Sequence, residues 1–539
     1  MRNSSDMQEG SKHSPSVYSI PPEILGRVFE FLVEIDPPRS SALQNRHRSA
    51  SAGSLRPESR ASTRARRNTV FAPAPPDRLG WFRVTHVSHY FRSAALAYPA
   101  LWDTIPFSLG ENWARLALER SQTAGLVVRH AIYNGTRGSD VLTQTDFLAD
   151  VLDRVRVVEL SGAQETLGAV LARLRKPAAQ LEVLSMQADR NPGPNEDWPF
   201  TIPRSLFQVD APGIRELRLD GVFLSTLPPH IPSLKHLSIC LRQSSQEYPR
   251  TRDVYGTLRV APNLRTLVLK HCLPRGEIIG LEPVTLPSLE SLELVDADSA
   301  ISRFMEVATF PSTATLDVQC SMVSNSEEDE SSRAQSLVVK CISRWSYPHS
   351  MVFASDGRGL EVSVSSTAAG KPDIYIFILP SGSPVWDYQR LVQVTSDAIS
   401  SPSLQSIELR FPVAPSSRSS SWKELPELML NALSRFDVME SVNVSRALGW
   451  AMCTALNSDP TDVLFPRLRE LTLEVVDFFE PAYLDSPLES LAHSRKGVLE
   501  KLRLVGCEYL GRERLIAELR TLLEVDVLDA ELPLVVVEP

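Results

Sequence analysis

The segment Pro212-Gly213-Ile214-Arg215-Glu216-Leu217-Arg218-Leu219 decides how most of this 539-residue sequence is expected to fold. A turn-forming proline and glycine are followed by apolar residues at relative positions 1, 4 and 6 of an L-x-x-L-x-L pattern. Successive side chains of a strand point to opposite faces, so Leu217 and Leu219 would point into a core while Glu216 and Arg218 stay outside. The segment therefore predicts a turn that delivers one apolar residue, followed by a short strand buried on one face.

The same register returns along the chain. Five further prolines precede complete copies, with apolar residues at Leu234, Leu237 and Ile239; Leu264, Leu267 and Leu269; Leu289, Leu292 and Leu294; Leu404, Ile407 and Leu409; and Leu468, Leu471 and Leu473. Copies without the proline occur at Leu181, Leu184 and Met186, at Leu499, Leu502 and Leu504, and in a weaker form at Val155, Val158 and Leu160. Such a pattern is typical of a solenoid, in which each unit buries its apolar face against its neighbours.

The spacing of the copies is uneven, from 20 residues between Ile214 and Leu234 to 33 residues between Leu181 and Ile214. The pattern is lost between about residues 310 and 400, where we expect strands at 360–364 and 374–378 and a solvated acidic loop at 321–332. We therefore predict an α/β protein in which a small N-terminal helical module precedes an irregular horseshoe of short parallel strands.

The N-terminal part of the sequence predicts two short helices. Residues 19–34 carry Pro21 and Pro22 near the start, where the fixed φ of proline suits a helix, and have an apolar stripe at helical spacing. That stripe consists of Ile24, Leu25, Val28, Phe29 and Leu32. Residues 79–97 form a second stretch with one apolar face. Each helix is too short to be stable alone, so the two must pack on each other or on a partner.

A basic insert at about 37–78 separates the two helices. From Arg39 to Arg78 it contains nine arginines against only Glu58 and Asp77, and serine, alanine and proline make up much of the remainder. Such a segment cannot bury enough apolar area to offset its chain entropy, so we predict that it is disordered, as are residues 1–17. Its ends are expected to lie close together if the flanking helices pack as neighbours.

Composition limits the classes of function. A formal net charge of −9 makes nucleic acid an unlikely partner, because binding phosphates requires a basic surface. The six cysteines contain no C-x-x-C pair, and those at Cys272 and Cys507 end copies of L-x-x-L-x-L-x-x-C, where we expect buried thiols that cap a turn. The sequence shows no secretory signal and no apolar run long enough to span a membrane, so we expect a protein of the cytoplasm or nucleus.

Three N-terminal stretches together resemble the F-box in the divergent form common in fungal proteins. Ile20-Pro21-Pro22-Glu23-Ile24-Leu25 is similar to the L-P-x-E-I-L opening of that family. Residues 79–92 are similar to its second half, V-C-R-x-W-R, although Ser88 and Phe91 replace the usual cysteine and tryptophan. Pro99-Ala100-Leu101-Trp102 is similar to the closing P-x-L-W. Followed by L-x-x-L-x-L copies, these motifs resemble an F-box protein with leucine-rich repeats.

The resemblance implies that residues 18–105 form a domain that binds the SKP-family adaptor of a cullin-RING ubiquitin ligase. Residues 106–539 would then contain a linker helix and the leucine-rich-repeat-like domain that holds a protein substrate. The adaptor contacts implied are Pro21, Pro22, Ile24, Leu25, Phe29, Val84, Val87, Phe91, Leu101 and Trp102. The alternative is a repeat scaffold outside any ligase, whose N-terminal helices only cap the solenoid.

The outward positions of the predicted strands are candidates for substrate contacts, because the open faces of repeat proteins bind protein partners. These candidates are Arg218, Lys270, Glu293, Glu408, Arg410, Glu474 and Arg503. The sequence contains no recognisable nucleotide-binding loop, metal-ligand spacing or catalytic pair, so we expect a non-enzymatic protein without cofactor or metal.

Overall fold

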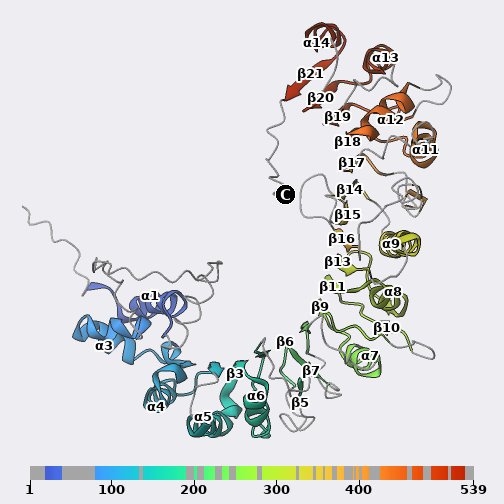
Figure 1. Cartoon of the computed structure of the whole chain (residues 1–539). Coiled ribbons are helices and arrows are strands. Elements are labelled where there is room, and N and C mark those ends of the chain that lie inside the picture. Colours follow the sequence, from blue (N-terminus) through green and yellow to red (C-terminus); the bar gives the residue numbers. More distant parts are fainter. Residues whose placement is uncertain are drawn as a thin grey trace, which may run out of the picture. The chain divides into compact units, whose positions relative to one another are not determined.

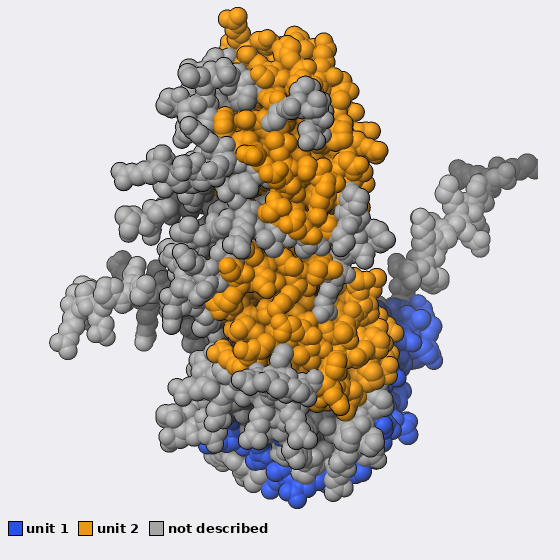
Figure 2. Space-filling view, turned by 90° about the vertical axis from the view of Figure 1, so that its right-hand side faces the viewer, with its two compact units in different colours: residues 1–233 blue, residues 234–539 orange. Residues whose placement is uncertain are grey.

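A computed structural model describes most of the chain, and the segments predicted to be disordered, 1–17 and nearly all of 37–78, lie outside it. The described residues are 19–38, 79–132, 138–189, 200–202, 212–224, 233–241, 251–275, 282–322, 327–343, 348–355, 359–366, 373–380, 393, 396–397, 399, 403–411, 425–457, 464–476, 487–507 and 512–528. The chain divides into two compact units, Met1–Ser233 and Leu234–Pro539 (Figure 2).

The predicted α/β class is confirmed, since the protein has a large, mostly parallel sheet of 17 strands, five in the first unit and twelve in the second (Figure 1). The elements of the first unit are α1 Pro22–Ile35, η2 Gly80–His86, α3 His89–Leu96, η3 Pro99–Trp102, β1 Thr104–Ile105, η4 Phe107–Leu109, α4 Glu111–Arg120, β2 Leu126–Ile132, α5 Gly138–Asp150, η5 Leu152–Arg154, β3 Val155–Gly162, α6 Gln164–Leu171, β4 Val183–Ala188, β5 Phe200–Ile202, β6 Glu216–Asp220 and β7 Val222–Leu224, where η marks a 3-10 helix.

The second unit follows the same alternation of strands and helices. Its elements are β8 His236–Cys240, α7 Thr251–Arg259, β9 Thr266–Lys270, β10 Val284–Thr285, β11 Ser291–Ala297, α8 Asp298–Val307, β12 Ala308–Thr309, β13 Thr315–Ser321, α9 Glu327–Ile342, β14 Ser350–Ser355, β15 Leu360–Ser365, β16 Ile374–Leu379, β17 Ser406–Arg410, α11 Leu425–Leu433, β18 Ser441–Ser445, α12 Ala447–Leu456, β19 Glu470–Glu474, α13 Pro487–Ser494, β20 Lys501–Val505, α14 Arg512–Arg520 and β21 Glu524–Leu528. Figure 1 shows the long helices of this unit along one side of its strands.

The N-terminal helices form a module with its own aromatic core. Phe29 of α1 meets Phe91 of α3 edge to face, with ring centroids 5.5 Å apart. Trp102 packs against Trp81 at 5.4 Å and donates its indole N–H to the carbonyl of Ala95 at 2.9 Å. Buried aromatic rings with a satisfied polar atom are a strong source of stability, so these short helices stabilise one another.

The second predicted helix, 79–97, is in fact two pieces. The 3-10 helix η2 ends at His86, and Ser88 then caps α3, with its hydroxyl oxygen accepting the Phe91 backbone N–H at 3.1 Å. A serine in this position satisfies an N–H that has no partner within the helix, which favours a new start at His89.

The two ends of the basic insert lie together, as predicted. The Trp81 backbone N–H donates to the carbonyl of Asp36 at 2.8 Å. Gly80 has a φ of +55°, and a Cβ there would lie 2.5 Å from the Asp36 carbonyl oxygen. Glycine is therefore required at the point where the chain returns from the insert.

The repeated sequence pattern forms the strands it predicts. All nine copies give strands, namely β3, β4, β6, β8, β9, β11, β17, β19 and β20, and all of their patterned apolar residues are buried. In β9, for example, Leu267 and Leu269 are fully buried while Thr266, Val268 and Lys270 face outward. The parallel register keeps such leucines in line, as where Leu267 is opposite Leu292 in β11.

At seven junctions a single backbone carbonyl ties one strand to its neighbour in the sheet. The carbonyl of Lys235 accepts the backbone N–H groups of both Arg265 and Thr266, at 2.8 and 3.0 Å. The same double acceptance is made by the carbonyls of Glu182, Arg265, His349, Gln405, Glu440 and Arg469. Except at His349, that carbonyl belongs to the residue directly after the first buried apolar residue of the pattern.

The middle of the second unit departs from the parallel pattern. The predicted strands at 360–364 and 374–378 are confirmed as β15 and β16, but β15 is antiparallel to both β14 and β16. The spatial order there is β13-β16-β15-β14-β17, with β16 parallel to β13 and β14 parallel to β17. The sequence predicted strands in this region without a direction, and β14 to β16 replace one regular repeat with a meander.

The predicted acidic loop at 321–332 is wrong from residue 327 onward, where α9 begins. The helix buries apolar residues at helical spacing in its later turns, including Leu337, Val338 and Cys341. Arg333 also forms an ion pair with the buried Asp298 at 3.1 Å. This packing fixes a segment whose polar first turn alone indicated a loop.

A buried arginine ties the end of α13 to the end of α12 and to the turn before β19. Arg495, directly after α13, donates its guanidinium N–H groups to the carbonyls of Leu456, Leu464 and Phe465 at 2.7 to 3.4 Å. Burial lowers its pKa. No carboxylate among the described residues lies within ion-pair distance of this guanidinium, so the carbonyls alone offset its loss of hydration.

We predict that Arg495→Ala lowers the free energy of unfolding by about 3 kcal/mol, because it leaves several buried carbonyls unsatisfied. Equilibrium denaturant unfolding of the full chain measures this loss. Arg469→Ala is the control, since Arg469 is exposed and lies 3.9 Å from Glu500, and it should change stability by less than about 0.5 kcal/mol. Equal losses of stability in the two variants would contradict a stabilising role for the hydrogen bonds of Arg495.

The residue after several strands adopts a left-handed backbone conformation. Gly221 and Gly506 do so with φ of 70° and 58°, which glycine tolerates without strain. His271, Arg446 and Val475 hold the equivalent places with φ of 53° to 55°. A β-branched residue rarely adopts such a φ, so Val475 is strained by the turn that its repeat requires.

Val475→Gly should raise the free energy of unfolding by up to about 1 kcal/mol, because relief of about 1–2 kcal/mol of strain exceeds the added entropy cost of glycine. The midpoint of thermal or denaturant unfolding measures the gain. The matched change Val505→Gly, within β20, should instead lower stability by about 1 kcal/mol. A loss of stability in both variants would contradict strain at Val475.

Candidate functional site

The first candidate surface lies on α1, whose two sides are both apolar. Leu25 and Phe29 are buried in the module, whereas the opposite side leaves apolar residues open at intervals of four, three and four. This exposed stripe consists of Ile24, Val28, Phe31 and Ile35, whose exposed fractions are 54%, 49%, 68% and 72%. We call these four residues the α1 stripe. A row of large apolar side chains facing water on one helix is typical of a surface that binds another protein.

The predicted adaptor residues divide between this surface and the core. Pro21, Pro22, Ile24 and Val87 are exposed, with Val87 at 65%. Val84 and Phe91 are half-buried, and Leu25, Phe29, Leu101 and Trp102 are buried. Phe31 and Ile35 were not among the candidates, although their places seven and eleven residues after Ile24 are a helical signal that the sequence contains.

The second candidate surface is the face of the second unit's sheet that the helices do not cover. Its residues are the alternate strand positions, and the register aligns them in rows across neighbouring strands. The central row runs Val268, Glu293, Asp317, Tyr375, Ser363, Val352, Glu408, Asn443, Thr472, Arg503 and Asp526. We call this side of the sheet the open face. Six of the seven predicted substrate residues lie on it.

Those six residues are already paired with neighbours. Lys270 lies 2.5 Å from Glu293, and Arg410 contacts Glu408 and lies 3.5 Å from Glu474. The same cross-strand pairing continues to the last strand in a network that includes Arg503.

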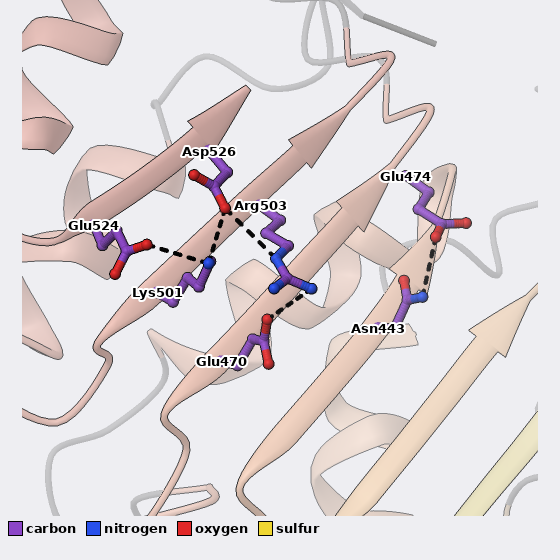
Figure 3. Close-up of polar contacts among 7 residues, drawn as sticks. All are labelled: Asn443, Glu470, Glu474, Lys501, Arg503, Glu524 and Asp526. Atoms are coloured by element: carbon purple, nitrogen blue, oxygen red, sulfur yellow. Dashed lines mark hydrogen bonds and ion pairs between the residues drawn. The ribbon is translucent and has the colours of Figure 1, made fainter. Parts of the chain in front are cut away.

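Figure 3 shows this network on β18 to β21, which we call the charged ladder. Arg503 reaches Glu470 at 3.0 Å and Asp526 at 3.7 Å, and Lys501 lies 2.9 Å from Asp526 and 3.1 Å from Glu524. Asn443 donates to Glu474 at 3.0 Å. Sequence reasoning missed Asn443 and Asp526, because their strands lack the leucine pattern.

Local fields shift several pKa values on this face. A hydrogen bond to Glu293 raises the pKa of Lys270, and hydrogen bonds from Lys501 lower the pKa of Asp526. Burial raises the pKa of Glu408, although Arg410 opposes that shift. On the charged ladder, both cations, Lys501 and Arg503, are thus engaged by carboxylates.

Arg218 belongs to the first unit, apart from the other six. It lies on β6 and pairs with Glu216 of the same strand. Beside it, the Gln187 side chain donates to the Asp220 carboxylate at 3.1 Å. The sequence correctly placed Arg218 on an outward strand position, and its charge too is already paired.

The thiols of Cys272 and Cys507 lie at the turns that end two repeats, as predicted, but only Cys272 is fully buried and Cys507 is half-buried. Cys272 donates to the carbonyl of Ile239 at 3.6 Å and Cys507 to that of Leu473 at 3.2 Å, each on the preceding strand. Burial raises the pKa of both thiols, which disfavours the reactive thiolate.

Neither a metal site nor a membrane helix is found within the described ranges. No group of three or more His, Cys, Asp or Glu side chains there is placed to hold a metal ion. In that same part of the chain, no helix combines the length and the apolar content needed to cross a bilayer.

Comparison with known proteins adds no relative. No family model matches the chain, and no curated protein matches it significantly.

Two adjacent residues of β20 test the division between the faces. Leu502→Ala should lower the free energy of unfolding by about 2–5 kcal/mol, because it removes a buried side chain. Arg503→Ala should lower it by no more than about 1 kcal/mol, because its pairs are partly exposed to water. Denaturant unfolding of both variants measures the difference, and a larger loss from Arg503→Ala would show that the charged ladder is a main source of stability.

Proposed function

We propose that the chain is an F-box-type substrate-recognition subunit of a cullin-RING ubiquitin ligase. In this proposal the helical module of α1, η2, α3 and η3 binds an SKP-family adaptor. The strand repeats form a leucine-rich-repeat-like solenoid that holds a protein substrate. The chain itself carries no catalytic step, and ubiquitin transfer belongs to the other subunits of the ligase.

The observation that carries the proposal is the α1 stripe. A helix that only capped the end of the repeats would bury its apolar side and present polar residues to water. Here α1 buries Leu25 and Phe29 in the module and still exposes Ile24, Phe31 and Ile35 on the other side. Such a helix is suited to a hydrophobic groove of a partner, with anchors at helical spacing.

The construction of the module also supports this role. The Phe29–Phe91 contact and the cluster around Trp102 fix the orientation of α1 without using the α1 stripe. The docking side is thus preorganised, which lowers the entropy cost of binding. Val87 adds a further exposed apolar residue at the end of η2.

Affinity purification of the full chain from a fungal cell extract tests the proposal. The wild-type chain should bring down an SKP-family adaptor and a cullin, whereas Phe31→Asp should not, because a charge in a desolvated apolar seam costs several kcal/mol. Phe31 is exposed, so this change should leave folding intact, as circular dichroism and the unfolding midpoint would show.

Leu528→Asp provides a matched control, since Leu528 is as exposed as Ile24 at 54% but lies on β21. It should retain the adaptor. Recovery of neither adaptor nor cullin with the wild-type chain, or equal recovery with Phe31→Asp, would contradict the ligase role and favour the repeat scaffold. Charged substitutions at Leu25 or Phe29 are unsuitable for this test, because they would also disrupt the core of the module.

A further inference from the structure

At the meander of β14 to β16 the open face carries aromatic and apolar side chains, unlike the charged ladder. Its outward residues include Tyr375 and Phe377 on β16 and Val352 and Ala354 on β14. Leu379, at the end of β16, is exposed. Large aromatic and apolar side chains here occupy positions that hold paired charges on β17 to β21.

Two carboxylates flank the aromatic residues. Asp317 on β13 is opposite Tyr375 in the parallel register, and Glu361 on β15 is opposite Phe377 in the antiparallel one. In the part of the chain that the structure describes, neither carboxylate has a basic side chain within ion-pair distance. The nearby Lys270 is engaged by Glu293. We call Asp317, Glu361, Tyr375 and Phe377 the aromatic-acid patch.

The charges of Asp317 and Glu361 both act on the Tyr375 side chain. Burial raises the pKa of Tyr375, and the charges of Glu361 and Asp317 raise it further. Burial raises the pKa of Asp317, to which Glu293 also contributes, while a hydrogen bond from Gln319 opposes the shift. Partly desolvated negative charge therefore lies on two sides of an aromatic surface, where a cation would be stabilised.

We infer that the aromatic-acid patch binds a polypeptide segment that carries an arginine or a lysine next to an apolar side chain. The cation would lie over the Tyr375 ring and between the carboxylates of Asp317 and Glu361. The apolar neighbour would pack on Phe377 toward Leu379. This inference names the class of substrate for the function proposed above, but the binding itself does not require that the adaptor be bound.

Charge complementarity favours this place over the charged ladder. On β18 to β21 an incoming cation would have to displace Arg503 or Lys501 from Glu470 or Asp526, which removes an existing ion pair for the one that it adds. At the aromatic-acid patch the acidic groups have no such partner, and aromatic residues are over-represented among those that dominate binding energy. An acidic segment would be repelled there.

Selection from a random 12-residue peptide library displayed on phage, with the full chain as bait, tests the inference. Enriched peptides should carry an arginine or lysine with an adjacent apolar residue, and their affinity should fall as salt is raised. For a synthetic peptide of enriched sequence, fluorescence polarisation should show at least about tenfold weaker binding to Tyr375→Ala and to the double variant Asp317→Asn, Glu361→Gln. Tyr375→Phe keeps the ring and should bind within about threefold of the wild type.

The matched control is Glu524→Gln, Asp526→Asn, which removes two carboxylates from the charged ladder and should bind within about twofold of the wild type. Three results would overturn the inference: no peptide enriched above background, enrichment of acidic or uncharged peptides, or basic peptides that bind Tyr375→Ala as well as the wild type. Co-purification of the adaptor with these same variants separates the two proposals. Loss of peptide binding with the adaptor retained leaves the ligase role intact, and loss of the adaptor from Phe31→Asp should not affect peptide binding.

Discussion

The double acceptance of two backbone N–H groups by one carbonyl, found at the start of seven strands, is the constraint on which the regular repeats depend. The carbonyl of Glu440, for example, accepts from both Arg469 and Glu470, and it follows directly on the buried Met439. One residue is thus buried in the core, and the residue after it fixes the register of the neighbouring strand. A slip by one residue would lose the hydrogen bonds and turn the apolar side chains outward at the same time. Because this junction is local, the helices and loops between strands are free to differ in length, which explains the uneven spacing of the copies.

β18, a strand that the leucine pattern missed, has the same backbone junction as most of the strands that the pattern found, but its side chains differ. β19 was recognisable through Leu468, Leu471 and Leu473, whereas β18 uses Met439, Val442 and Val444, and β13 begins from Ala314. The repeat requires only that these positions be apolar. A search for leucine therefore finds fewer strands than the sheet contains. Strand direction is less accessible still, because the alternation of β15 is the same in a parallel and an antiparallel neighbour. In α9 a polar first turn concealed a helix that its later turns stabilise by packing.

The candidate surfaces, too, could be predicted from the sequence only in part. The periodicity of α1 correctly indicated a helix with apolar residues, but Leu25 and Ile24 are adjacent and both apolar, and only the packing of α1 on η2, α3 and η3 decides which of them is buried. Outward positions such as Arg410 and Arg503 follow from the two-residue period of a strand. Their partners do not, because Glu474 and Glu470 approach them only through the register of neighbouring strands. Tyr375 and Asp317 are 58 positions apart in the sequence and become neighbours because β16 returns to pair with β13.

The meander of β14 to β16 also bears on how the second unit acquires its structure during synthesis. In a regular repeat array each new strand adds to the one made just before it, so order can spread along the growing chain. Here β14 emerges without its partners, and the edge of β13 stays unpaired until β16 has been made. Residues 322–373 thus have to be synthesised before the sheet can extend past β13, and an open sheet edge is a site for pairing with foreign strands. The feature that gives the open face its aromatic surface therefore also delays the pairing of β13 on that edge until β16 has been made.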